Sequence, residues 1–223
     1  MTLVLPDLPA YFTHGRSFRD TGTTIIGDPY DHILTVSVES VGELWLPSGR
    51  IVVSDPAFLG DAEMVPLAAE LGAGCHQVSV SRVTTTYVAD PHISWDDVAA
   101  ARIVVREEPT VAWEPARPGD PEEEHGPGEG SVIYGYGVDS GRSCFVDPEV
   151  NRALAEDDAA RERMSEAALS WGTEPSVLAD PDSGHQAAGF PSGAGDGVYP
   201  TWLGRDAEGR VTCVVTTFRH DIR

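Results

Sequence analysis

Lysine is absent from this 223-residue chain, whose 15 basic residues are all arginine. Without lysine the chain cannot use a P-loop, a Schiff-base lysine or a lysine general base. Cysteine is scarce, because Cys75, Cys144 and Cys213 are the only three and lie far apart among apolar or β-prone neighbours. Their number and spacing favour reduced, buried thiols over disulfides, and no Cys-x-x-Cys pair offers a zinc ligand set.

Long apolar segments are also missing. No stretch reaches the roughly 18 consecutive apolar residues that a membrane-spanning helix needs. Residues 1–9 contain neither the basic region nor the apolar region of a secretion signal. We therefore expect a cytoplasmic protein that does not associate with membranes.

Positive charge is in short supply. The chain has 36 acidic residues against 15 basic ones, which gives a formal net charge of -21. Such a field repels phosphate backbones and anionic lipids, so we expect no nucleic-acid partner. It attracts cations, so a basic protein or a small ligand is the expected partner of a monomer or weak homodimer.

Turn-forming residues, in contrast, are abundant, with 23 glycines and 17 prolines. This composition predicts short strands joined by turns, and the length suits a single domain over residues 1–223. Residues 117–130 combine proline and glycine with five carboxylates. Because that segment offers little apolar area to offset the entropy of ordering, we expect it to be a mobile acidic loop.

Period-two alternation and β-branched runs predict strands at residues 44–46, 51–53, 78–81, 102–105, 132–138 and 211–218. Pro47-Ser48-Gly49 predicts a hairpin turn between the first two of these strands. Residues 206–209 predict a second hairpin turn, between 198–203 and 210–218, with Gly209 available where φ must be positive.

Helix signals are fewer. Asp147-Pro148-Glu149 supplies an N-cap, a proline at the first helical position and an acid in the first turn. These residues predict one principal helix over about 148–169 that packs on one face of a sheet. Shorter helices are expected around residues 62–71 and, after Ser94, at 95–101. The predicted fold class is α+β, with strand-rich antiparallel sheets in the majority. Three tryptophans in the strand blocks, Trp45, Trp113 and Trp202, are expected to be largely buried.

The common catalytic and metal-binding motifs do not fit. The seven histidines have no His-x-His or His-Glu-x-x-His spacing. The segment that begins at Asp180 lacks an EF-hand's later ligands, and Gly135-Tyr136-Gly137 lacks the rest of a dinucleotide loop. Ser192 is not in a nucleophile elbow, and the apolar neighbours of Cys144 favour an inert thiol.

Three aspartates stand in turn-like, glycine- or proline-rich sequence: Asp55, Asp139 and Asp196. If they converge, their carboxylates could bind a divalent cation or act as an acid/base pair. If they do not, each aspartate caps its own turn through side-chain to backbone hydrogen bonds. Asp147 is assigned to the helix cap.

Three blocks of sequence containing these aspartates resemble a known bacterial family, domain of unknown function 4241. The blocks are residues 43–56, 137–147 and 193–206, with a shorter one at 113–116. The resemblance implies a family-like core over about residues 43–218. It implies no reaction and gives the aspartates no role.

Two functions from different classes remain open. The first is a non-enzymatic interaction or ligand-binding domain without a cofactor, immunity-like or inhibitor-like toward a basic partner. The second is a divalent-cation-dependent hydrolase that uses the three aspartates, with a metal of unknown identity. Candidate ligand-binding residues are Arg142, Tyr199 and Arg205, the two arginines being suited to an anionic group.

Overall fold

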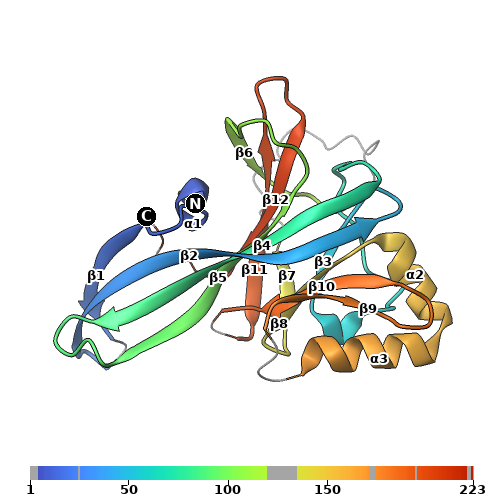
Figure 1. The fold of residues 1–223 in the computed structure, drawn as a ribbon. Helices are drawn as coiled ribbons and strands as arrows, with labels where there is room; N and C mark the ends of the chain where they lie inside the picture. Colours follow the sequence, from blue (N-terminus) through green and yellow to red (C-terminus); the bar gives the residue numbers. More distant parts are fainter. Residues whose placement is uncertain are drawn as a thin grey trace.

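The computed structural model describes residues 5–24, 26–119, 135–170, 174–193, 195–219 and 222. The predicted α+β class with dominant strands is confirmed, since two antiparallel sheets are accompanied by two main helices (Figure 1). The strands are β1 (Ser17–Thr23), β2 (Pro29–Leu46), β3 (Val52–Ser54), β4 (Gly74–Tyr87), β5 (Ser94–Val104), β6 (Ala112–Pro115), β7 (Gly135–Val138), β8 (Arg142–Val146), β9 (Ser176–Ala179), β10 (Gln186–Pro191), β11 (Gly197–Arg205) and β12 (Val211–Thr217). The helices are α1 (Leu8–Tyr11), the 3-10 turn η1 (Pro56–Phe58), α2 (Pro148–Glu156) and α3 (Asp158–Leu169).

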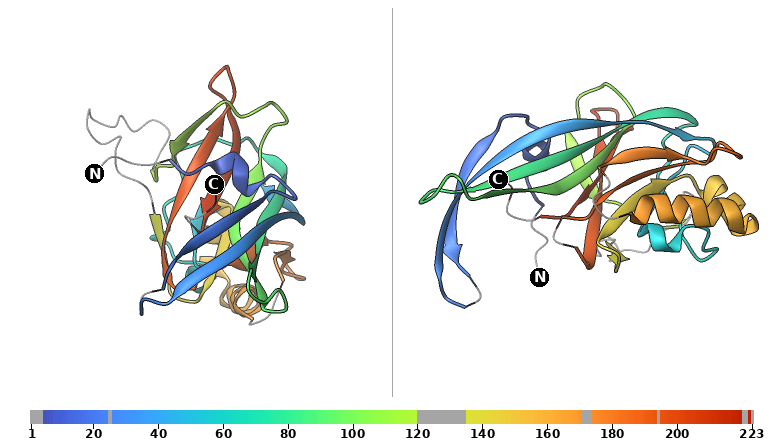
Figure 2. Two further views of the ribbon diagram at one scale, coloured as in Figure 1. Left: turned by 90° about the vertical axis from the view of Figure 1, so that its left-hand side faces the viewer. Right: turned by 60° about the horizontal axis from the view of Figure 1, so that its bottom comes forward.

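The large sheet has eight strands in the order β1-β2-β4-β5-β12-β11-β6, and β7 pairs with the first part of β11. Strand β2 has 18 residues and β4 has 14, so with β1 and β5 they project beyond the rest of the molecule (Figures 1 and 2). We call this projection the arm. Leu34 and Val36 alternate with more exposed residues and, with Val83, form a core against α1. This alternation lets the arm be apolar on one face and solvated on the other.

The small sheet has the order β3-β8-β10-β9. One of its faces packs against the inner half of the large sheet around Phe145 and Phe190, whose ring centroids are 4.9 Å apart. The opposite face is covered by α2 and α3 (Figure 2). Leu154 and Met164 are buried in the cluster that joins these helices to the sheet. The predicted packing of the helical segment on one face of a sheet is therefore confirmed.

The helical segment is two helices, not the single one predicted over 148–169. Asp157 is extended, with φ -123 and ψ 90, and separates α2 from α3. Its carboxylate accepts from the Ala160 N–H at 3.0 Å, so it acts as the N-cap of α3. A capping residue in the middle of a helical pattern competes with the helical backbone and divides the segment.

The hairpin predicted at Pro47-Ser48-Gly49 is wrong. Strand β2 pairs with β4, whereas β3 pairs with β8, so the turn passes the chain from one sheet to the other. Gly49 has φ 71 and approaches a neighbouring backbone so closely that a Cβ would lie 2.5 Å from the Ala73 nitrogen. The tight contact fixes the direction of the chain at this crossing.

Two further predicted helices are absent from the described part of the chain. Residues 62–71 form turns, in which Leu67 and Leu71 donate backbone hydrogen bonds to Ile51 and Gly49. Residues 95–101 belong to β5, where alanines 99–101 are buried between β4 and β12. Tertiary pairing overrides the helical propensity of alanine at these positions.

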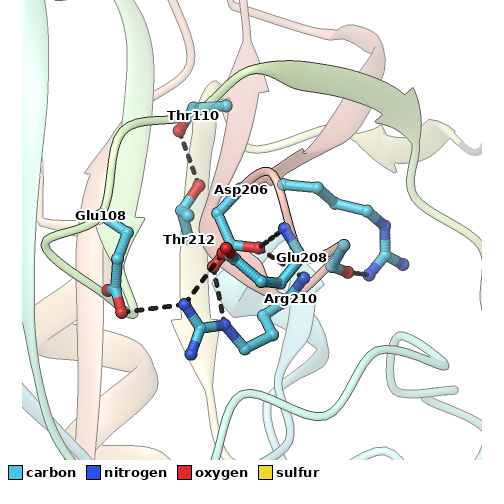
Figure 3. A network of polar contacts seen from close by, with 8 residues as sticks. Glu108, Thr110, Asp206, Glu208, Arg210 and Thr212 are labelled. Atoms are coloured by element: carbon cyan, nitrogen blue, oxygen red, sulfur yellow. Dashed lines mark hydrogen bonds and ion pairs between the residues drawn. The ribbon is translucent and has the colours of Figure 1, made fainter.

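The C-terminal hairpin is confirmed, because β11 pairs with β12 and Gly209 has φ 80. Figure 3 shows its turn, in which the Asp206 carboxylate accepts from the backbone N–H groups of Glu208 and Arg210. The guanidinium of Arg210 then joins Asp206 to Glu108 on a neighbouring segment.

Of the three tryptophans expected to be buried, only Trp202 is, with 2% of its surface exposed. Trp113 is partly buried, and the prediction is wrong for Trp45, which is 47% exposed.

The start of the predicted mobile loop is anchored, since Gly119 donates to the Pro66 carbonyl and accepts from Arg50. The remainder of that prediction, residues 120–130, lies outside the described residues. No helix in the described part of the chain is long and apolar enough to cross a bilayer.

Candidate functional site

Asp55 lies where the two sheets meet and is fully buried. Its Oδ1 accepts from the Ala57 N–H at 2.8 Å and the Ser140 hydroxyl at 2.7 Å. Its Oδ2 accepts from the N–H groups of Asp139 and Ser140 at 2.9 and 2.8 Å. A carboxylate has about four acceptor positions, so these four donors occupy the group. The Asp55 carboxylate thus caps η1 and fixes the turn between β7 and β8.

Asp147 has the equivalent set of contacts, with the roles of the two segments exchanged. It caps α2 through the Glu149 N–H at 2.7 Å, as predicted, and its Oδ2 also accepts from the N–H and hydroxyl of Ser48 at 2.9 and 2.8 Å. The cap therefore explains only part of its role. Asp55 accepts from Ser140, in the segment that leads to Asp147. Asp147 in turn accepts from Ser48, in the segment that leads to Asp55.

This reciprocity reflects an internal repeat in the sequence. Ser-Gly-Arg, four further residues and Asp-Pro occur at 48–56 and again at 140–148. Both glycines have φ 71, and each serine hydroxyl accepts from the N–H of the arginine that follows. Equivalent residues Val53 and Phe145 lie opposite each other in the antiparallel β3–β8 pair. The two copies are therefore related by a local twofold axis between these strands. We call this region the paired clamp.

The structure brings the three predicted acidic segments together but not as a free carboxylate cluster. Ser192 donates its N–H to the Gly141 carbonyl, which places the turn before Asp196 against the turn after Asp139. The side chains of Asp139 and Asp196 are exposed, whereas Asp55 is buried and occupied. Among the described residues, no three His, Cys, Asp or Glu side chains are placed to hold a metal ion.

The three predicted ligand-binding residues have structural contacts. Arg205 forms a two-pronged ion pair with Glu114 at 2.8 and 2.7 Å, which ties β11 to β6. Tyr199 is buried and donates its hydroxyl to the Gly195 carbonyl at 2.7 Å, and burial raises the pKa of its phenol. Arg142, the first residue of β8, is buried, and desolvation lowers the pKa of its guanidinium.

Of the three thiols expected to be buried, Cys144 and Cys213 are buried, and the prediction is wrong for Cys75, which is exposed. Cys144 lies on β8 with a pKa raised to about 12, chiefly because burial penalises the thiolate. Burial likewise raises the pKa of Cys213 on β12. Only the thiolate is a good nucleophile, so both groups are held in the unreactive form near neutral pH.

A second candidate site, which no sequence motif indicated, lies at the distal end of the arm. Tyr30 and His32 on β2, Tyr87 on β4 and Trp95 on β5 form an aromatic quartet. The centroid of the His32 ring lies 5.0 Å from Tyr30, 4.4 Å from Tyr87 and 5.5 Å from Trp95. Strand register places His32 opposite Tyr87, two positions beyond the Leu34–Thr85 pair of the arm core. The quartet therefore continues the apolar face of the arm beyond α1.

Exposed apolar side chains occur at the same end of the arm as this quartet. Trp95 is 40% exposed and Ile93 is 50% exposed, and the exposed side chains of Ile26, Ile33 and Val88 lie on the same distal strands and turns. Two polar atoms of this face, Nε2 of His32 and Oγ1 of Thr85, are buried without a hydrogen-bond partner in the described part of the chain. Buried polar atoms are normally paired, so these two are exceptions at the base of the quartet, beside the exposed ring of Trp95.

The charge of the arm end is negative. Residues 17–33 and 84–97 carry six carboxylates and one arginine, Arg19, which is paired with Asp31. Trp95 donates its indole N–H to Asp97 at 3.1 Å, and this carboxylate also meets Arg219. The arm end thus combines the exposed ring of Trp95 with surplus carboxylates.

Comparison with known proteins identifies the family but no function. The family model described as Protein of unknown function (DUF4241) matches residues 44–216. The match contains the whole paired clamp and begins within β2, after α1, β1 and the first part of β2. No curated protein and no solved structure matches the chain. Because the matched region is well over half of the sequence, the chain belongs to the family described as Protein of unknown function (DUF4241).

Proposed function

We propose that this chain is a cytoplasmic, non-enzymatic binding protein that holds a basic protein partner at the distal end of its arm. The observation that carries the proposal is the aromatic quartet in an acidic setting, in which Trp95 is exposed and the other three rings are partly buried. A cationic side chain over a tryptophan or tyrosine ring gains about 0.5–2 kcal/mol. Arginine and lysine of a partner therefore complement both the rings and the carboxylates of the arm end.

The net charge of -21 supports the same partner chemistry. A strongly acidic protein attracts a basic one over long range and accelerates their encounter. Exposed aromatic groups then supply the short-range apolar contact that holds the complex. An arm that projects from the body suits an inhibitor-like or immunity-like role, because it can reach into a concave surface of its partner.

The environment of the paired clamp supports a non-enzymatic role. The acceptor positions of Asp55 are filled by four donors, and Arg205 is held by Glu114. The pKa of Cys144, raised to about 12, keeps its sulfur protonated. Asp55 joins the end of β3 to the turn after β7, Arg205 ties β11 to β6, and Cys144 lies in the core, so each group has a structural reason for its position.

A labelled peptide tests the proposal. We would measure the fluorescence anisotropy of a 12-residue peptide that alternates arginine and alanine, at physiological salt. Trp95→Ala is expected to weaken its binding about tenfold or more, because central aromatic contacts dominate interfaces. Val198→Ala, at an exposed apolar position on β11, is the matched control and should bind like the wild type. Equal affinity of the Trp95→Ala variant and the wild type would refute the proposed site, as would equal binding of a peptide with glutamate in place of arginine.

A further inference from the structure

A cleft of about 610 Å³ lies on the side of the molecule formed by α2 and the segment after η1. Its apolar lining comes from Ala62, Met64, Pro66, Pro148 and Ala155. Its charged lining consists of Arg50, Asp61, Glu149 and Arg152. The volume falls within the range of about 300–1,000 Å³ found for small-molecule sites.

The walls of this cleft are held in place by buried polar contacts. Asn151 accepts from the Gly60 N–H at 2.8 Å and donates to the Asp61 carbonyl at 2.9 Å, which fixes the 60–61 segment to α2. Ser48 is held by Asp147 of the paired clamp. Arg50 donates to the carbonyls of Leu67 and Gly119. The cleft is therefore formed before any ligand arrives, so binding does not have to order it.

Two opposite charges on the helix wall form no ion pair with the described residues. Glu149 and Arg152 are one turn apart on α2 and both line the cleft. Neither side chain has an ion pair or hydrogen bond with the described residues, whereas most arginines of this chain are paired. Side chains three apart on a helix lie about 5–6 Å from each other at Cβ. The pair thus offers one cationic and one anionic contact from neighbouring turns of the same helix wall.

We propose that this cleft binds a small zwitterion of about dipeptide size, with its anionic group at Arg152, its cationic group at Glu149 and an apolar body against Met64 and Pro66. A neutral zwitterion avoids the repulsion that the net charge of -21 imposes on a simple anion. An extended chain spans about 3.3–3.6 Å per residue, so the charged ends of a dipeptide can reach two long side chains that stand one helical turn apart. The apolar walls select a body such as leucine or phenylalanine.

Isothermal titration with the dipeptide Leu-Phe tests this inference, using its N-acetylated and C-amidated forms as charge controls. The zwitterion should bind the full chain at least tenfold more tightly than either blocked form. Arg152→Gln should abolish the preference for the zwitterion over the C-amidated form, and Arg152→Lys should retain part of that preference. Glu149→Gln should abolish the preference for the zwitterion over the N-acetylated form. Arg106→Gln, at an exposed arginine without an ion pair to the described residues, is the matched control and should bind like the wild type.

Three outcomes would overturn the inference: no binding of Leu-Phe at millimolar concentration, equal binding of the blocked forms, or unchanged binding by the Arg152→Gln variant. None of these outcomes bears on the arm. Because the cleft and the aromatic quartet share no residue, the proposed binding of a basic partner is tested separately by Trp95→Ala.

Discussion

The paired clamp and the arm end use polar and aromatic residues in opposite ways. In the clamp, two buried aspartates are surrounded by donors, and the surrounding apolar side chains are covered by the second sheet. At the arm end, the Trp95 ring stays exposed and two polar atoms of the same face have no partner in the described part of the chain. The difference indicates that the acids most visible in the sequence hold the fold, whereas surface suited to a partner lies elsewhere.

Within the clamp, the two copies of the repeat also differ. Asp55 begins a three-residue 3-10 turn, whereas Asp147 begins the nine-residue helix α2. The same cap can start either element because it satisfies only the first backbone N–H groups. The residues after the cap decide the length of the element, and the longer helix provides one wall of the cleft.

The largest difference between the regions should appear on truncation of tryptophan. Trp202→Ala is expected to lower the free energy of unfolding by about 3–5 kcal/mol, since it leaves a cavity in the arm core. Trp95→Ala should cost less than about 1 kcal/mol, because its ring is already partly in solvent. Urea unfolding of both variants measures the contrast. Similar losses in the two variants would show that the arm end is a structural core.

The next largest loss of stability is expected from substitution of the buried aspartates in the clamp. Asp55→Asn is expected to cost about 2–4 kcal/mol, since an amide nitrogen in either orientation faces at least one backbone N–H. Asp147→Asn should cost slightly less, because three donors surround that carboxylate instead of four. Denaturant midpoints check both values. Wild-type stability of the Asp55→Asn variant would contradict the structural role of this buried carboxylate.

A third test concerns an ion pair outside both regions, between Arg163 on α3 and Asp180 in the turn after β9. The guanidinium of Arg163, with help from Ser183, holds the pKa of Asp180 well below its usual range. The stabilisation is complete above the unfolded pKa of about 4 and is lost as the pH falls toward the lower folded pKa. Arg163→Gln brings the folded pKa closer to its ordinary value. We expect the variant to lose stability less steeply than the wild type between about pH 4 and pH 2.

Urea midpoints across that acid range measure the effect, and Arg106→Gln serves as the control for loss of one positive charge. A wild-type slope in the Arg163→Gln variant would mean that Asp180 does not depend on this partner.

The smallest effect is expected at the exposed edge of the clamp. Asp196→Asn should change the free energy of unfolding by less than about 0.5 kcal/mol, because the side chain is exposed and the amide keeps an acceptor oxygen. Thermal melting with and without millimolar magnesium, manganese or calcium provides the measurement. A cation-dependent rise in the wild type that is lost in the Asp196→Asn variant would favour the hydrolase hypothesis instead.

Local signals were sufficient for part of this fold. The Asp147-Pro148 cap and the turn ending at Gly209 depend on neighbouring residues only, so the start of α2 and the C-terminal hairpin could be predicted from the sequence. The repeated Ser-Gly-Arg and Asp-Pro spacing was also visible there, although the pairing of each aspartate with the other copy's serine required the β3–β8 register. The arm was not predictable in the same way. Ser94 and the following acids resemble a helix start, but pairing with β4 and β12 makes this segment a strand and exposes Trp95.

The most direct test of this division of roles compares two variants in one peptide titration. Trp95→Ala removes an aromatic ring at the arm end and keeps the net charge, whereas Asp196→Asn removes a charge beside the clamp and keeps every ring. We predict that the arginine-alanine peptide binds the Trp95→Ala variant about tenfold or more weakly and the Asp196→Asn variant within about twofold of the wild type. The reverse order would place binding at the clamp or in the general acidic field, and would contradict a binding role for the arm end.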